Sequence, residues 1–258
     1  MTRSILLSFL LLSALGCASP QAPAEAPGLG AEVARHHGVE AWRTKRAVRA
    51  KLVVKFGDKP ALEGVLLYAP SANTVRLELT NGTLLVFDGQ RAWSAPGPFP
   101  RARFHLLTWP YFLAAPFKLE DPGSHLEAVG EHALVAGQPP LRVGRLTFGA
   151  GVGDTPDDWY DAYVSQEGAL KALGYIVTYG KEAAAAEQAP HACVYSEFVE
   201  VEGVRFATSW TFHDWTRAGG VTGAPLGVGS LSEITFVTPK AGDFAKPAGA
   251  VEDALPKK

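Results

Sequence analysis

The alternation of residues from Val48 to Phe56 constrains the fold more than any other feature of the sequence. Hydrophobic side chains stand at every second position, and the basic residues Arg49, Lys51 and Lys55 stand between them. A period of two sends alternate side chains to opposite faces of a β-strand. The segment therefore predicts a strand with one face turned toward a hydrophobic core.

Similar segments follow in close succession, separated by turn motifs. Asn81-Gly82 and Asp88-Gly89 are pairs typical of tight hairpin turns, because these residues tolerate a positive φ. Consecutive strands joined by tight turns pair in the antiparallel sense. Early strands are expected at 48–56, 62–68, 74–79, 83–87 and 91–95, and later ones at 126–135, 141–148, 159–164, 170–179, 193–201, 204–215 and 231–237. The glycine-rich segment 216–229 is expected to be a loop.

Two segments have helical character. Residues 29–45 place hydrophobic side chains three and four positions apart, although Gly38 weakens the pattern. Residues 101–117 form the most aromatic stretch of the chain, and prolines punctuate it. We predict one or two short helices there, broken near Pro110. This stretch is hydrophobic on all sides, which is not expected of an exposed helix, so we interpret it as a lid over the sheet.

The N-terminus carries a different signal. Arg3 precedes a hydrophobic run, Ile5 to Leu12, that is shorter than the roughly 20 residues a membrane-spanning helix requires. The following residues, Ser13-Ala14-Leu15-Gly16-Cys17, resemble a bacterial lipobox, although Ala14 stands where Leu is most usual. We expect a signal peptide at 1–16, a lipidated Cys17, and a flexible Pro/Ala-rich tether at 17–28. The alternative is an ordinary signal peptide that leaves Cys17 as a free thiol.

The position of Cys17 bears on localisation and on the second cysteine. By resemblance to the usual sorting rule, Ala18 in place of Asp points to the outer membrane, with the protein facing the periplasm. An acylated Cys17 cannot pair with Cys193, the only other cysteine. Cys193 is then a lone thiol on a predicted strand, and the favoured interpretation is a buried, unreactive one.

Composition excludes one class of partner. The 258-residue chain has a net charge of −2 and no basic stripe, so nucleic-acid binding has no electrostatic basis. Glycine and proline are spread along the chain and favour many short elements over a few long helices. We expect one folded domain at 29–238, followed by a polar tail at 239–258.

The order of elements resembles the lipoprotein-carrier superfamily that includes LolA and LolB. The segments that carry the resemblance are HHGVEAWRTKRAVRAKLVVKF, TLLVFDGQRAWSAP, in which a strand ends in Asp-Gly and Trp93 stands on the next strand, and EVEGVRFATSWTFHDW. The resemblance implies a mainly antiparallel β fold with few helices: an open, incomplete β-barrel around an apolar cavity, with a helical lid. In the known members such cavities hold acyl chains.

The resemblance directs attention to aromatic residues as ligand-binding candidates. Trp109, Tyr111, Phe112 and Phe117, within the predicted lid, would line or gate the cavity. Trp93 is a further candidate, although ordinary core packing remains the alternative for any one tryptophan. Lid contacts are strong, since removing roughly 100 Å² of apolar surface from water contributes about 2.5 kcal/mol. A ligand of similar apolar area would have to replace them.

Four acidic residues are the main candidates for chemistry. Asp154, Asp157, Asp158 and Asp161 suggest a calcium site, but their spacing is not that of an EF-hand loop. A turn or helix start capped by Thr155 is the favoured interpretation, with Asp161 on the strand face opposite Tyr160. The histidines show no metal-ligand spacing, and nucleotide-binding or nucleophile motifs are missing. We therefore expect no enzyme activity and no cofactor or metal.

Three functions follow from these observations. The leading hypothesis is an outer-membrane-anchored periplasmic lipoprotein that binds a lipid or another hydrophobic molecule, with an envelope protein as a possible partner. The second is a structural or interaction lipoprotein whose barrel is filled by its own side chains. The third is a metal-dependent hydrolase that uses the aspartate cluster.

Overall fold

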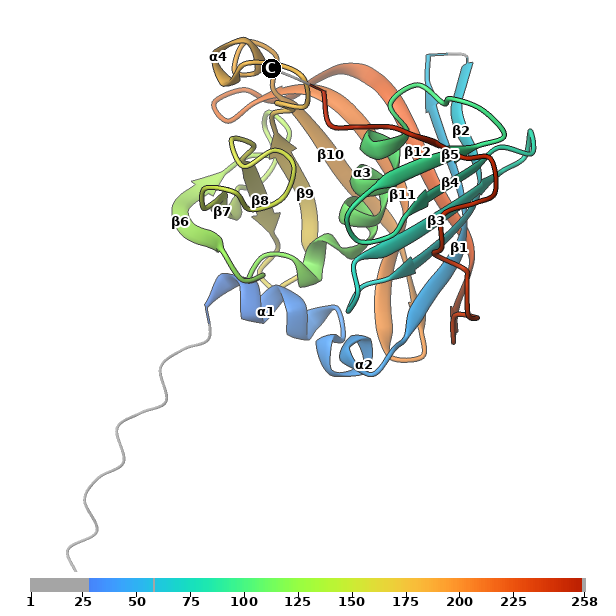
Figure 1. Cartoon of the computed structure of the whole chain (residues 1–258). Coiled ribbons are helices and arrows are strands. Elements are labelled where there is room, and N and C mark those ends of the chain that lie inside the picture. The colour runs from blue at the N-terminus through green and yellow to red at the C-terminus, as the bar shows by residue number, and fades with distance from the viewer. Residues whose placement is uncertain (1–27, 58, 257–258) are drawn as a thin grey trace, which may run out of the picture.

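The computed structural model describes residues 28–57 and 59–256 (Figure 1). The predicted signal peptide, the lipidation site at Cys17 and all but the last residue of the tether lie outside this range. Among the described residues no helix is long and apolar enough to cross a membrane.

The described residues form thirteen strands. They are β1 (Ala47–Phe56), β2 (Lys59–Ala69), β3 (Thr74–Leu79), β4 (Leu84–Phe87), β5 (Ala92–Ala95), β6 (Ser124–His132), β7 (Leu141–Phe148), β8 (Tyr160–Val164), β9 (Leu170–Tyr175), β10 (His191–Val201), β11 (Val204–Thr216), β12 (Gly220–Val237) and β13 (Val251–Glu252). Most of the strands lie within a few residues of their predicted ranges.

All thirteen strands form one antiparallel sheet in the order β13-β5-β4-β3-β2-β1-β12-β11-β10-β9-β8-β7-β6. The outermost strands, β13 and β6, do not pair with each other, so the sheet is strongly curved but not closed (Figure 1). The predicted fold class, an open half-barrel with few helices, is confirmed.

The helices are short. They are α1 (Leu29–His36), α2 (Val39–Arg43), α3 (Ala102–Ala114), a 3₁₀ turn (Ala115–Phe117) and α4 (Ala183–Ala186). Helices α1 and α2 lie at one end of the sheet, α3 lies inside its curve, and α4 lies at the other end (Figure 1). Gly38, with φ of 85°, separates α1 from α2 within the segment that the sequence predicts as one helix. Figure 1 shows α3 surrounded by the concave side of the sheet.

The predicted break near Pro110 is wrong. Helix α3 continues through this residue, and the change of geometry comes later, in the 3₁₀ turn that contains Pro116. Proline costs about 3 kcal/mol inside a helix. Burial of Leu106, Trp109 and Phe112 within the curved sheet offsets that cost.

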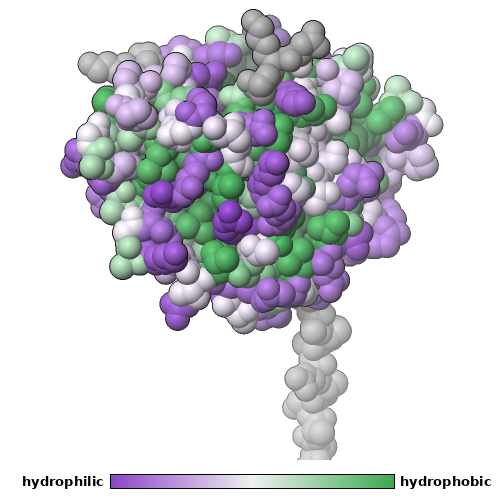
Figure 2. All heavy atoms as spheres, turned by 90° about the vertical axis from the view of Figure 1, so that its right-hand side faces the viewer, coloured by the Kyte–Doolittle hydropathy of each residue, from purple (hydrophilic) through white to green (hydrophobic). Residues whose placement is uncertain are grey.

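The alternation in β1 positions the core as predicted. Ala50, Leu52 and Val54 are fully buried, whereas Arg49 and Lys55 are exposed on the outer face. Figure 2 shows the side of the molecule on which β1, β2 and β3 lie, and hydrophilic side chains are scattered there among hydrophobic ones. A second, smaller cluster around Tyr163 and Trp215 covers the outer face of the opposite part of the sheet.

The prediction of a glycine-rich loop at 216–229 is wrong. Most of this segment belongs to β12, which pairs with β1 and β11. The glycines serve the packing of aromatic rings. A Cβ at Gly229 would lie 2.9 Å from a ring carbon of Trp210, and one at Gly227 would lie 2.5 Å from the ring of Phe56. Glycine here allows large rings to lie directly on the strand backbone.

The polar tail expected after residue 238 is in fact packed against the domain. Residues Val251 and Glu252 form β13 and pair with β5. The Asp253 carboxylate accepts a hydrogen bond of 2.7 Å from the backbone N–H of Arg103, in the first turn of α3. A carboxylate at a helix N-terminus satisfies a free N–H and interacts favourably with the helix dipole, so the C-terminal segment holds α3 in place.

His37 joins the N-terminal helices to the sheet. Its Nδ1 lies 2.9 Å from the carbonyl oxygen of Arg205 in β11, and its Nε2 accepts a hydrogen bond of 3.1 Å from the N–H of Leu170 in β9. Acceptance at Nε2 requires the neutral ring, in which Nδ1 carries the hydrogen and donates to the carbonyl oxygen. The side chain is 1% exposed. Burial lowers the pKa of His37 from 6.5 to about 4.

Acid is therefore expected to destabilise the protein through His37. The stabilising contribution is complete above the unfolded-state pKa of 6.5 and is lost as the pH falls toward 4, by up to about 3 kcal/mol. Chemical denaturation between pH 7.5 and pH 4 measures this loss. His37→Gln should make the profile shallower, because glutamine does not titrate, while the buried His105 still contributes to the remaining slope. An equally steep profile in this variant would contradict the assignment.

Candidate functional site

A cavity of about 980 Å³ lies between α3, the concave face of the sheet and the loops beside them. Its hydrophobic wall includes Phe104, Leu106, Leu107, Trp109, Phe112, Phe148, Val177 and Phe212. Phe56 and Leu226, which also line it, are 45% and 40% exposed, so they form part of its rim. The open barrel is thus not completely filled by α3.

Three of the five predicted ligand-binding residues lie on the cavity wall: Trp109, Tyr111 and Phe112, all from α3. Trp109 is fixed by a hydrogen bond of 3.0 Å from its Nε1 to Nδ1 of His105, one turn earlier. This bond requires a neutral imidazole, and burial lowers the pKa of His105 to about 4. The backbone of Phe112 is held by the Tyr195 hydroxyl, which donates to its carbonyl oxygen at 3.1 Å.

The other two predicted residues lie away from the cavity wall. Phe117 stacks on Trp42 of α2, with ring centroids 4.7 Å apart, and so joins the lid segment to the N-terminal helices. Trp93 on β5 donates its Nε1 hydrogen to Asp88 at 3.0 Å, and the ammonium group of Lys246 lies over its ring. Both side chains have partners in the domain that account for their positions.

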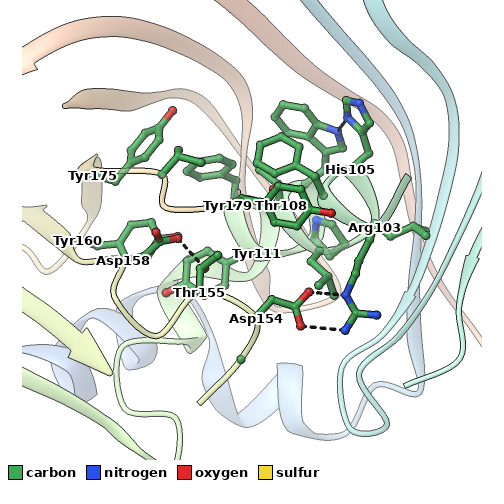
Figure 3. Close-up of a pocket in the computed structure, with 18 of the residues that line it drawn as sticks. Arg103, His105, Thr108, Tyr111, Asp154, Thr155, Asp158, Tyr160, Tyr175 and Tyr179 are labelled. Atoms are coloured by element: carbon green, nitrogen blue, oxygen red, sulfur yellow. Dashed lines mark hydrogen bonds and ion pairs between the residues drawn. The ribbon is translucent and has the colours of Figure 1, made fainter. Parts of the chain in front are cut away.

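A series of tyrosines on the cavity wall was not predicted from the sequence. Tyr111 of α3 stacks on Tyr160 of β8 with ring centroids 5.0 Å apart, and Tyr160 stacks on Tyr175 of β9 at 6.0 Å. Figure 3 shows Tyr160 and Tyr175 on one side of the pocket, across from Arg103. The alternation of β8 and β9 could have indicated the inward-facing positions of Tyr160 and Tyr175, but not their contact with a helix distant in sequence.

Two of the basic residues that line the cavity are paired with acids. Arg103 binds Asp154 through two bonds, one of them 2.8 Å from Nη2 to Oδ1, and Lys118 lies 2.8 Å from Asp121. Figure 3 shows the Arg103–Asp154 pair at the edge of the pocket. Arg101 and Lys181 also line the cavity, but both are exposed.

The aspartate cluster has structural roles. Asp158 is 8% exposed and accepts hydrogen bonds from the Thr155 hydroxyl and from the N–H and hydroxyl of Thr178. Asp161 is fully buried on the outer side of β8 between Arg145 and Arg217. It faces away from Tyr160, as the sequence predicts. Within the described ranges no group of three or more His, Cys, Asp or Glu side chains could hold a metal ion.

Cys193 is fully buried in β10, on the same core as α3. Burial raises the pKa of its thiol well above the ordinary value, so the reactive thiolate is disfavoured. The predicted buried, unreactive thiol agrees with this environment.

Comparisons with known proteins identify the fold. No protein-family model matches the sequence, and no curated protein matches it. A LolA superfamily protein from Nitrosomonas europaea superposes with a TM-score of 0.55 at 11% identity, over 84% of this chain and 97% of that one. A domain named for outer membrane lipoprotein sorting, from Vibrio parahaemolyticus, gives 0.49 at 10% identity, over 84% and 94%.

A DUF1329 family protein from Desulfovibrio piger gives a TM-score of 0.44 at 11% identity, over 83% of this chain and 94% of that one. At sequence identities this low, a structural match shows a shared fold and no more. The match to the Nitrosomonas europaea protein is the one that supports the shared fold. The resemblance to the lipoprotein-carrier superfamily is confirmed at this level: the chain has a LolA-like fold.

Proposed function

We propose that the protein binds a hydrophobic molecule, a lipid or an acyl chain, in the cavity beside α3, and that it does so without catalysing a reaction. The observation that carries the proposal is the cavity itself: about 980 Å³, with aromatic and aliphatic side chains from α3 and the sheet on its wall. Ligand sites in proteins occupy roughly 300–1,000 Å³ and are mostly apolar. The LolA-like fold supports the same class of function.

The cavity also favours binding over a purely structural role. A structural lipoprotein would fill the half-barrel with its own side chains, whereas here α3 leaves a space that opens at the exposed Phe56 and Leu226. Each 100 Å² of ligand surface removed from water there would contribute about 2.5 kcal/mol. The paired aspartates give no comparable support to a metal-dependent hydrolase.

We further propose that a lipid on Cys17 anchors the protein in the outer membrane, facing the periplasm. This part of the proposal rests on the lipobox-like sequence before Cys17 and on Ala18 after it. Incorporation of a radiolabelled fatty acid into the wild-type chain, but not into Cys17→Ser, tests it. Equal labelling of the two proteins would contradict the anchor.

Organic extraction of the purified full-length protein, followed by mass spectrometry, tests the binding function. We expect a lipid or other hydrophobic molecule to be recovered in stoichiometric amount. The extraction is repeated on Cys17→Ser, which separates a bound ligand from the covalent anchor. Recovery of nothing hydrophobic from this variant, together with failure of the protein to bind an added neutral lipid such as a fatty acid methyl ester, would count against the proposal.

A further inference from the structure

Three tyrosines on the cavity wall carry hydroxyl groups that the described part of the protein leaves unpaired. No other described residue makes a hydrogen bond with the hydroxyl of Tyr111, Tyr160 or Tyr175, although all three rings pack closely. Tyr175 is only 8% exposed. None of the three hydroxyls is among the fully buried side-chain atoms that lack a partner, so each is open to the cavity and free to donate to a molecule within it. In the unliganded protein, water in the cavity can hydrate these groups.

The stacking of the rings brings the three hydroxyl-bearing residues together on one wall. Ring planes are inclined by 28° between Tyr111 and Tyr160 and by 29° between Tyr160 and Tyr175. The residues come from α3, β8 and β9, and Figure 3 places all three along the pocket. A ligand that excludes water from this wall would leave these donors unsatisfied unless it carried a hydrogen-bond acceptor.

The charges around the tyrosines select the kind of acceptor. Burial is the main cause that raises the pKa of Tyr111 and Tyr160, and the nearby carboxylate of Asp158 raises both further. The Asp158 carboxylate also lines the cavity and is bonded to Thr155 and Thr178, not to a cation. It would repel an anion at the hydroxyls. The cations Arg103 and Lys118 are neutralised by their own partners, and Arg101 and Lys181 are exposed to solvent.

We infer that the Tyr111–Tyr160–Tyr175 wall is a hydrogen-bonding subsite for an uncharged acceptor, such as an ester or amide carbonyl, on an otherwise hydrophobic ligand. The inference rests on the proposed function and narrows it: the ligand is a neutral amphiphile, and neither a plain hydrocarbon nor a free fatty acid anion. The hydroxyls donate to the carbonyl oxygen while the rings contact the adjoining hydrophobic chain.

Competition binding tests this subsite. A neutral hydrophobic fluorophore is bound to the full chain. It is then displaced by three competitors of one chain length: an alkane, a fatty acid methyl ester and a fatty acid carboxylate. We expect the ester to displace the fluorophore at roughly threefold to tenfold lower concentration than the alkane. This is the gain in affinity that one added hydrogen bond provides. The triple variant Tyr111→Phe, Tyr160→Phe, Tyr175→Phe keeps the rings and should lose this preference.

Tyr163→Phe is the matched control. Tyr163 lies on the same strand as Tyr160, but on the outer face, where its hydroxyl accepts a hydrogen bond from Trp215. This variant should keep the ester preference. Equal displacement by ester and alkane in the wild type, the strongest displacement by the carboxylate, or an ester preference retained in the triple variant would overturn the subsite while leaving the proposed function in place. Failure of the fluorophore to bind at all would overturn both.

Discussion

Replacing Asp161 with asparagine is expected to destabilise the protein by about 2–3 kcal/mol, less than the cost of leaving a fully buried charge unpaired, because the two guanidinium groups that lose their partner are 25% and 35% exposed. The Asp161 carboxylate is fully buried and binds two guanidinium groups: Arg217 at 2.7 and 2.9 Å, and Arg145 on the neighbouring strand. Asparagine keeps the shape of the side chain and removes the charge, so both cations would lose their partner.

Denaturant unfolding of the wild type and Asp161→Asn at neutral pH measures this effect. Burial by itself would raise the pKa of Asp161, but the two guanidinium groups outweigh it and lower the pKa. The contribution is therefore present at neutral pH and is lost as the solution becomes strongly acidic. Glu200→Gln, on an exposed position of β10, is the control and should change stability by less than about 0.5 kcal/mol.

The same variant separates a structural carboxylate from one that takes part in ligand binding. Asp161 lies on the face of β8 opposite Tyr160, outside the cavity. Folded Asp161→Asn protein should therefore bind a hydrophobic ligand with unchanged affinity. A stable variant that has lost ligand binding would contradict this assignment.

Replacing Trp109 with alanine is expected to cost about 3–5 kcal/mol, the range for removing a large aromatic side chain from a core. Trp109 is 2% exposed and contacts Phe112 and Phe212, with ring centroids 6.3 and 6.1 Å apart. Because its ring is part of the cavity wall, the deletion enlarges the space available to a ligand. Apolar voids bind apolar molecules, so a bulky hydrophobic ligand should bind more tightly to Trp109→Ala than to the wild type.

Trp93→Ala is the matched control for this experiment. Trp93 is 6% exposed and is similarly buried, but it does not line the cavity. Its removal should also destabilise the protein, without a change in ligand affinity. Calorimetric titration of both variants with one bulky hydrophobic ligand decides the matter. Equal changes in affinity for the two variants would show that the ligand does not occupy the space beside Trp109.

Local patterns in the sequence predicted the antiparallel strands and their turns, and the resemblance to the lipoprotein-carrier superfamily added the open half-barrel. In β1, buried and exposed side chains alternate along the strand itself. Gly82 and Gly89 adopt a positive φ within short turns, so a few neighbouring residues are enough to predict them. Segment 216–229 was mispredicted because its glycines are favoured by the rings of Phe56 and Trp210, which come from other strands. Pro110 was mispredicted for a similar reason, since tertiary burial of α3 outweighs a local propensity.

The sequence predicted only those site residues that belong to its conspicuously aromatic segment. Trp109, Tyr111 and Phe112 stand in a conspicuously aromatic segment, and α3 carries them to the cavity. Phe117 belongs to the same segment, but the 3₁₀ turn directs it to Trp42. The stack of Tyr111 on Tyr160 and Tyr175 joins elements that are far apart in the chain, so no local pattern contains it.

The most direct test of the account is equilibrium binding of a neutral hydrophobic fluorophore to the wild type and to Thr108→Trp. Thr108 lies on α3 and lines the pocket (Figure 3), so the larger ring should occupy it. The account predicts saturable binding at one site in the wild type, weakened at least about tenfold in a variant that unfolds at the same temperature. Equal binding by the two proteins, or no binding by either, would contradict it.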